Sequence, residues 1–386
     1  MSNKAFLLSI ALCAAVGAAP VPNAVVEKAG AERITVSVAT PPGAYTSSLK
    51  RNLQISGWFT LAGEGAAIKV SGTPGVSVTA TGRGKTITAT TAFQDDRGAR
   101  MAARRFVDTM VKEFSDGGRG FATTRLAFVN RKGPDNAELY TCYPDGYDIR
   151  QITSDGCAAV GPRWAPDGET IYYTSFIHKF GNVFRINASA GQRPVPLAPF
   201  KGTATGAAIA PDGNRCAIVL SYEGNPELYV MDIASRRIKR MTNTPAAAEA
   251  SPCWSPDGTR IAYVSDQSRH PQVYILDVAS RRSVRFTNKG SENTNPDWNA
   301  DGKLVWASKR QGQTVLMVAD VAAGEGAARA VTTPGSWEHP SWAANGRHVV
   351  ASRDKALFLV DTDPDADKPV QLFHNKGNWM NPALSR

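Results

Sequence analysis

The stretch Pro252-Cys-Trp-Ser-Pro-Asp-Gly258 recurs with variations along this chain of 386 residues. In each copy a proline or alanine stands two residues before a large apolar residue, and all copies but the truncated last one then reach an Asp-Gly or Asn-Gly pair. The steps between successive copies are 45, 45, 44, 44 and 42 residues, for starts at Pro162, Ala207, Pro252, Pro296, Pro340 and Pro382. A period of about 40 to 45 residues is typical of a β-propeller with one four-stranded blade per repeat.

Each repeat is predicted to contain four short strands joined by polar turns. The apolar run Arg260-Ile-Ala-Tyr-Val-Ser265 follows the first turn, and 272–277 and 283–287 supply two more strands. An aspartate in such a turn can accept hydrogen bonds from the backbone ahead of it, and glycine tolerates a positive φ. We therefore expect a structural role for the turn aspartates Asp167, Asp212, Asp257 and Asp301.

The two ends of the repeat region predict how the propeller closes. The last repeat stops after one strand, whereas the chain enters the region near Thr124 with three strands. The partial repeats 124–161 and 382–386 together contain 43 residues, which matches the period. A C-terminal strand that completes the first blade leaves no sheet edge unpaired. The predicted fold is mainly β, with a six-bladed β-propeller over 122–386.

Residues 33–121 lack the repeat and are predicted to form a small α/β domain. The segment 34–38 alternates like a strand, and Leu49 and Leu53 indicate a helix over 47–56. Three β-prone segments follow, at 68–70, 76–80 and 86–90, and then a helix capped by Asp95 or Asp96. The apolar stripe of this last helix is expected to be core and consists of Met101, Phe106, Met110 and Phe114.

The first 32 residues are predicted to be a leader followed by an arm. Lys4 precedes the apolar run Ala5–Val16, and small residues follow at 17–19, which is the pattern of a secretory signal peptide. A packed N-terminal helix is the weaker interpretation, because Pro20 would end it. We expect a signal peptide over 1–19 and a flexible arm over 20–32.

The composition excludes several classes of protein. With 42% hydrophobic and 20% charged residues the chain can bury a core, so intrinsic disorder is excluded as its main state. No run of 18 apolar residues follows position 20, so no transmembrane segment is expected in the mature chain. The formal net charge of +10 favours acidic partners. Nucleic acid is not an expected partner of a secreted chain without aromatic residues interleaved among basic ones.

No pattern predicts catalysis, a cofactor or a bound metal. The nucleophile elbow Gly-x-Ser-x-Gly and the zinc motif His-Glu-x-x-His are both absent from the sequence. Four cysteines remain after the predicted cleavage, at spacings that fit neither a zinc site nor a redox pair. They could form disulfides in an oxidising compartment or be small buried apolar residues, and their pairing stays open for Cys142, Cys157, Cys216 and Cys253.

The chain resembles the TolB proteins of Gram-negative envelopes. The resemblance is carried by Gly118–Val129, Asp145–Thr153 and Gly224–Ser235, and by the order of signal peptide, small α/β domain and propeller. Before residue 118 it depends on Leu53–Phe59. The first domain is shorter than in the family, and 63–93 has no clear counterpart to the family's middle strands and helix.

The resemblance implies a non-catalytic, monomeric scaffold of the Tol-Pal system in the periplasm. Members of that family bind the peptidoglycan-associated lipoprotein Pal at a propeller mouth. Their mature N-terminal segment takes part in binding the inner-membrane protein TolA. Together these contacts support outer-membrane integrity and constriction at cell division.

The loops that enter the innermost strands are the expected partner-binding positions, because aromatic and charged groups on rigid loops are the usual anchors. The candidates at the mouth are Thr203, Glu249, Glu292, Asn293, Trp337, Glu338, His339 and Trp379. The candidates for TolA contact in and beside the arm are Val25, Val26, Glu32 and Arg33. Two alternatives stay open. One is a periplasmic propeller enzyme or glycan-binding module, and the other is a TolB-like relative with a different partner.

Overall fold

The computed structural model describes residues 33–90, 92–178, 180–188, 193–200, 202–222, 224–366, 368–373 and 377–386. The predicted signal peptide and the predicted arm, including Val25, Val26 and Glu32, lie outside the described residues. Arg33 is described, and it stands half-buried directly before the first strand.

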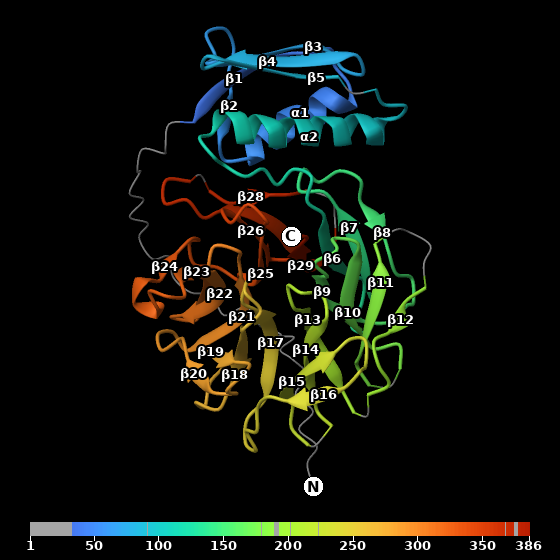
Figure 1. The fold of residues 1–386 in the computed structure, drawn as a ribbon, viewed down its shortest axis with the longest axis vertical. Coiled ribbons are helices and arrows are strands. Elements are labelled where there is room, and N and C mark those ends of the chain that lie inside the picture. Colours follow the sequence, from blue (N-terminus) through green and yellow to red (C-terminus); the bar gives the residue numbers. More distant parts are fainter. Residues whose placement is uncertain are drawn as a thin grey trace.

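A five-stranded sheet with two helices on one face forms the first domain (Figure 1). The strand order is β2-β1-β3-β4-β5, and β1 is parallel to both β2 and β3. The helices lie between this sheet and the propeller, so they cover the sheet and also meet the second domain (Figure 1). The elements are β1 (Ile34–Ala39), α1 (Ala44–Ile55), β2 (Phe59–Leu61), β3 (Ile68–Thr73), β4 (Ser77–Gly82), β5 (Lys85–Ala89) and α2 (Asp96–Phe114).

The two helices differ from the sequence prediction only near their ends. α1 begins at Ala44, three residues earlier than predicted, because the backbone N–H of Ser47 already bonds the carbonyl of Gly43 at 3.0 Å. Asp95 is confirmed as the cap of α2, since its carboxylate accepts a backbone hydrogen bond from the first turn at 2.7 Å. The predicted core stripe of α2 is buried except for Met101, which is half-buried.

Six four-stranded sheets follow and form the propeller (Figure 1). The first three blades are β29 (Trp379–Leu384) with β6 (Leu126–Arg131), β7 (Ala137–Cys142) and β8 (Arg150–Gln151); β9 (Ala159–Trp164), β10 (Thr170–Ser175), β11 (Asn182–Asn187) and β12 (Val195–Pro196); and β13 (Ala204–Ile209), β14 (Arg215–Leu220), β15 (Glu227–Asp232) and β16 (Ile238–Arg240). The last three are β17 (Glu249–Trp254), β18 (Arg260–Ser265), β19 (Gln272–Asp277) and β20 (Ser283–Arg285); β21 (Glu292–Trp298), β22 (Lys303–Arg310), β23 (Gln313–Asp320) and β24 (Arg329–Ala330); and β25 (Glu338–Trp342), β26 (His348–Arg353), β27 (Ala356–Asp361) and β28 (Val370–Gln371).

The C-terminal strand closes the ring, as the sequence predicted. β29 pairs with β6 in antiparallel register, with Ala383 opposite Ala127. Beyond the last pair, the backbone and hydroxyl of Ser385 bond the backbone of Arg125 at 2.8 Å each. The six-bladed fold preceded by a small α/β domain is therefore confirmed, with the last strand of the chain inside the first blade.

Three of the four turn aspartates have the predicted role. Asp167, Asp212 and Asp257 each accept a backbone hydrogen bond two residues ahead, at 2.8 to 3.0 Å. The Ser255 hydroxyl and this backbone bond lower the pKa of Asp257 to about 2. Asp301 differs because its turn is one residue shorter and Asn299 accepts those backbone bonds instead.

Among the described residues, an arginine stacked on a tryptophan links three pairs of neighbouring blades. The guanidinium groups lie 4.8 to 4.9 Å from the ring centres in the pairs Arg125 over Trp164, Arg215 over Trp254 and Arg260 over Trp298. In the sixth blade the matching register position is held by a histidine, and the next inner strand has leucine in place of tryptophan. Two contacts to the first domain occur there instead. The His348 ring stacks on the Phe121 ring with the ring centres 4.6 Å apart, and the Arg347 guanidinium lies 4.4 Å from the centre of the Trp58 ring.

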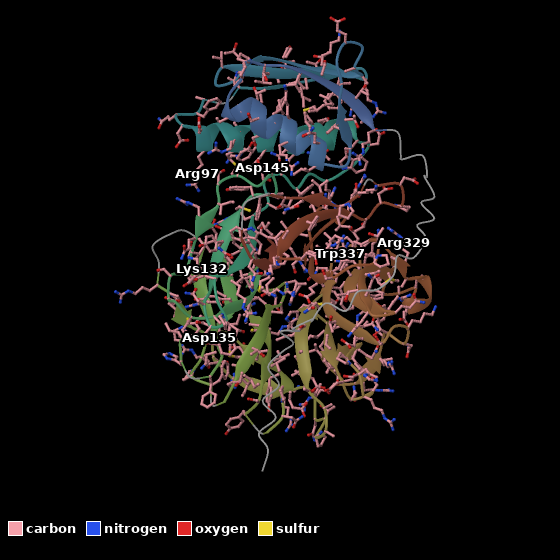
Figure 2. The ribbon with its side chains drawn as sticks, turned by 180° about the vertical axis from the view of Figure 1, so that it is seen from behind. Arg97, Lys132, Asp135, Asp145, Arg329 and Trp337 are labelled. Atoms are coloured by element: carbon pink, nitrogen blue, oxygen red, sulfur yellow. The ribbon has the colours of Figure 1, made fainter. Side chains whose placement is uncertain are left out.

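A buried ion-pair network fixes the first domain to the first blade. Arg104 of α2 is fully buried, and it donates two hydrogen bonds of 2.9 Å to Asp145 and one of 2.9 Å to Asp148. Ser48 and Asn52 of α1 donate to the same Asp145 carboxylate at 2.8 and 2.9 Å. Both aspartates belong to the β7–β8 turn, and Figure 2 shows Asp145 directly below the helices. Because each charge has partners, the junction can be buried without an unpaired ion.

Candidate functional site at the propeller mouth

The direction of the inner strands gives the propeller two different faces. Each inner strand, β9, β13, β17, β21, β25 or β29, begins at one face, and the first five end at the opposite face in an Asp-Gly or Asn-Gly turn. The first domain contacts that turn face, where Arg119 pairs with Asp301 at 2.6 Å and Arg347 donates to the carbonyl of Gly57 at 3.1 Å. We call the opposite face the mouth; it consists of the amino ends of the inner strands and the loops beside them.

Every inner strand is interrupted by a β-bulge near the mouth. The register against the second strand shifts in all six blades. At each shift one residue adopts a left-handed backbone with φ between 49 and 64°, namely Gly161, Gly206, Ser251, Asn295, His339 and Asn381. Such bulges re-aim a side chain, and they are frequent beside binding sites.

The bulge residues of neighbouring blades lie close to one another. The amide of Asn295 donates to the hydroxyl of Ser251 at 3.3 Å, from the fifth blade to the fourth. A Cβ added to Gly206 would lie 3.1 Å from the ring of Pro252, so little space for a side chain remains between the third and fourth blades. The six positions therefore form a ring that is polar in the first, fourth, fifth and sixth blades and bare in the second and third.

All eight candidate residues from the sequence lie at the mouth, although they differ in exposure. Glu338 is exposed, whereas Thr203, Glu292 and His339 are half-buried. These four side chains can reach a partner directly.

The other four candidate side chains are buried and support the rim from within. Trp337 is fully buried, its indole N–H bonds the carbonyl of Thr333 at 2.9 Å, and Figure 2 shows it inside the propeller. Asn293 is also fully buried and accepts a hydrogen bond from the Trp306 indole at 2.9 Å. A buried side chain does not contact a partner, so Trp337, Asn293, Glu249 and Trp379 belong to the wall of the site.

Glu249 is a buried carboxyl at the mouth without a cation among its described contacts. Both of its oxygens lie 3.0 Å from the Thr244 hydroxyl, which is also 3.2 Å from Glu227. Burial, reinforced by the nearby Glu227 carboxylate, raises the pKa of Glu249 to about 7. This carboxyl consequently changes charge near neutral pH, directly below the rim.

His339 combines a functional position with an unusual backbone. Its φ is 51°, and its Nδ1 is buried without a hydrogen-bond partner among the described residues. Burial and the nearby Arg163 lower the pKa of its imidazole to about 4. The ring is therefore neutral at pH 7, and it can offer a donor and an acceptor to a partner.

The other bulge residues were not singled out by sequence reasoning. The signal that could have found them is their constant place, since each one stands immediately before the first residue of a repeat copy. In four copies that bulge residue is polar or histidine, namely Ser251, Asn295, His339 and Asn381. The repeat was interpreted only for its turn and its tryptophan, so this position was missed.

No group of three metal-ligating side chains occurs within the described ranges, and the four cysteines there, Cys142, Cys157, Cys216 and Cys253, are all free thiols. None of the helices in the described part of the chain is both long and apolar enough to cross a membrane. Fold and site together define a six-bladed β-propeller with one face covered by an α/β domain and the other face open.

Comparisons with known proteins agree with this description. A family described as "TolB beta propeller domain" matches residues 113–386, and the chain therefore belongs to the TolB family. It is 30% identical to the Tol-Pal system protein TolB of Nitratidesulfovibrio vulgaris over 37% of this chain, and 30% identical to that of Desulfosudis oleivorans over 38%. Each alignment spans 32% of the relative's own length.

A solved structure extends the likeness to both domains. The crystal structure of TolB from Acinetobacter baumannii superimposes with a TM-score of 0.79, covering 93% of this chain and 98% of that one at 23% identity. At that identity the likeness concerns the fold alone. The fold is thus shared along nearly the whole chain, including the first domain, whose sequence departs most from the family pattern.

Proposed function

We propose that this protein is a non-catalytic, monomeric scaffold of the Tol-Pal system in the periplasm, released from a signal peptide over 1–19. In this proposal the propeller mouth binds a Pal-like peptidoglycan-associated lipoprotein, and residues 20–33 help to bind a TolA-like inner-membrane protein. The two contacts would support outer-membrane integrity during constriction. Membership of the TolB family and relatives named as Tol-Pal system proteins support this assignment.

The observation that carries the proposal is the difference between the two propeller faces. The turn face is occupied by the first domain through buried ion pairs, whereas the mouth offers exposed Glu338, half-buried Glu292 and neutral His339 on a closed ring of strands. A rigid ring holds these groups in place before binding, so little conformational entropy is lost when a partner docks. A partner can therefore dock on the mouth without displacing the first domain.

The experiment is calorimetry of the mature chain with the periplasmic domain of the same organism's Pal. Binding with a Kd in the micromolar range or tighter, about −8 kcal/mol or better, is expected. Deletion of residues 20–33 should change binding of the TolA-like domain. No detectable binding of Pal by either form would favour a TolB-like relative with a different partner.

A matched pair of variants places the contact on the mouth. The double variant Glu338→Ala with His339→Ala should weaken Pal binding by about tenfold or more. Glu64→Ala removes an exposed carboxylate from the first domain and should leave the affinity unchanged. Trp337 is unsuitable for this test, because alanine there would leave a large cavity in the propeller.

A further inference from the structure

Two neighbouring loops of the mouth carry exposed apolar side chains. The β10–β11 loop contributes Phe176, Ile177 and Phe180, which are 38%, 46% and 55% exposed, and the β14–β15 loop contributes Tyr222, which is 53% exposed. We call these four residues the apolar patch. Exposed apolar groups that cluster on one face commonly mark an interaction site.

The other blades show that the fold does not require apolar residues there. The corresponding loops of the first, fourth, fifth and sixth blades are polar at their tips, over 132–136, 266–271, 311–312 and 354–355. Four of six copies of the same turn thus do without an apolar side chain. The patch in the second and third blades consequently needs a reason other than propeller packing.

The described ends of the β10–β11 loop are hydrogen-bonded to residues of the inner strands or directly before them. The backbone N–H of Phe176 bonds the carbonyl of Ala158 at 3.0 Å, and the carbonyl of Gly181 accepts from Ala204 at 2.8 Å. Gly181 also lies beneath the Phe176 ring, where an added Cβ would be 3.1 Å from the ring carbons. Phe176 is therefore presented from a hydrogen-bonded end of its loop.

The two loops are also joined to each other through the mouth candidate Thr203. The backbone N–H of Ser221 donates to the carbonyl of Thr203 at 3.0 Å, and the Ser221 hydroxyl accepts from the Thr203 N–H at 3.0 Å. Tyr222 follows directly. The patch is thus continuous with the mouth, beside the second and third blades, where the bulge residues are glycines.

The opposite side of the mouth is charged. Arg269 and Lys289 are exposed cations on loops of the fourth blade, whereas Lys355 of the sixth blade stands beside the exposed carboxylates of Asp354 and Glu338. An acidic partner surface is complementary to the fourth blade, and an apolar partner surface is complementary to the patch. The mouth therefore has two chemically distinct halves.

We propose that the apolar patch is the specificity-determining anchor for a folded protein partner. That partner places an apolar loop on the second and third blades and carboxylates opposite Arg269 and Lys289 of the fourth blade. The inference depends on the proposed function, because it describes how the Pal-like partner would dock on the mouth. It adds residues of the second blade, which the sequence candidates do not include.

A protein surface fits the mouth better than a bilayer does. Exposed carboxylates stand on the same face, at Asp135, Glu338 and Asp354. An anionic bilayer is repelled by each of them, whereas a protein can place a cation or a gap opposite each one. The experiment must therefore distinguish attachment of the patch to a membrane from binding of the patch to a protein.

The test is calorimetry of the full mature chain with the Pal-like domain, for the wild type and for the double variant Phe180→Ser with Tyr222→Ser. The double variant should bind at least tenfold more weakly. The matched control is Val284→Ser, which removes a 67% exposed apolar side chain from the outer strand β20 and should bind like the wild type. Circular dichroism melting of all three chains checks that the two variants have the same melting temperature as the wild type.

The outcomes separate the two proposals. If the wild type binds and the double variant binds equally tightly, the patch is not the anchor and only this inference fails. If no form binds the Pal-like domain, the proposed function fails and the inference fails with it. If the wild type floats with vesicles of phosphatidylethanolamine and phosphatidylglycerol and the double variant does not, the patch is a membrane contact and the inference is overturned.

Discussion

The two faces of the propeller use charge in opposite ways. On the turn face, the fully buried Arg104 is matched by Asp145 and Asp148, and a second arginine, Arg347, is matched by Asp361 at 2.7 Å. At the mouth, the buried carboxyl of Glu249 is bonded by the hydroxyls of Thr244 and Ser265 and has no cation among its described side-chain partners. The buried charges of the turn face are paired, many of them between the two domains, whereas the mouth has the paired Glu227 with Arg240 at 2.8 Å and beside it a buried carboxyl without a cation among its described contacts.

This difference separates residues that hold the molecule together from residues that are available for binding. A buried ion loses several kcal/mol of hydration, and well-placed counter-ions and hydrogen bonds must offset that loss. The turn face satisfies this condition from both domains, so the first domain is a fixed part of the structure. Within the described ranges no domain covers the mouth, and its exposed groups are the ones we expect to exchange water for a partner.

Breaking the turn face should have the largest effect. Arg104→Ala leaves Asp145 and Asp148 at the junction without their main cation, and we expect a loss of about 3–5 kcal/mol in the free energy of unfolding. Urea denaturation followed by tryptophan fluorescence measures it. Arg100→Ala is the matched control, since Arg100 is partly exposed and Asp148 keeps Arg104; its expected cost is about 1 kcal/mol or less. Equal losses of stability for Arg104→Ala and Arg100→Ala would contradict the larger role that we assign to Arg104.

Glu249 offers an intermediate effect that depends on pH. Its pKa in the folded protein is about 7, against 4.5 ordinarily, so the folded state binds the extra proton and stability falls as the pH rises from about 4.5 to 7. Glu249→Gln removes this dependence and should stabilise the protein by about 1–3 kcal/mol at pH 8 relative to the wild type. Urea melts at pH 5 and pH 8 measure it. If the stability difference between Glu249→Gln and the wild type is the same at pH 5 and pH 8, the Glu249 carboxyl does not change its charge between these two pH values.

The smallest effect is expected where the two domains meet in solvent. Arg119 and Asp301 form a 2.6 Å ion pair, with 49% and 40% of their side chains exposed. Exposed pairs contribute about 0.2–1 kcal/mol, so Arg119→Ala should barely move the urea midpoint, and 0.5 M salt should weaken the wild-type pair to a similar degree. A loss above about 2 kcal/mol would mean that this pair, rather than Arg104, controls domain docking.

The propeller could be predicted because its information is local and repeated. Pro252, Trp254 and Gly258 each have counterparts at a constant spacing, and a period that leaves three strands at one end and one at the other requires closure by the last strand. The position of the candidate residues at the rim followed from the same register. The exposure of each side chain did not follow from the register, because Trp337 and Glu338 are adjacent in sequence and yet Trp337 is buried and Glu338 is exposed.

The docking of the first domain could not be predicted, because its contacts join residues that no local pattern relates. Asp145 stands in Tyr143-Pro-Asp-Gly146, which is indistinguishable from a turn aspartate of the repeat. Its partner Arg104 lies 41 residues earlier, on a helix of the other domain. The ring of bulge residues could be predicted in principle. Its signal is the single residue that precedes each of the six repeat starts, and that residue lies outside the repeat motif itself.

The place of β29 within the first blade has a consequence for biosynthesis. A ribosome delivers β6, β7 and β8 long before β29, so the first blade lacks its innermost strand throughout synthesis of the other five. An unpaired strand edge next to apolar residues is prone to wrong pairing. The α/β domain is made first and covers the β7–β8 turn through Arg104, so it can hold the nascent first blade while that blade waits for its last strand.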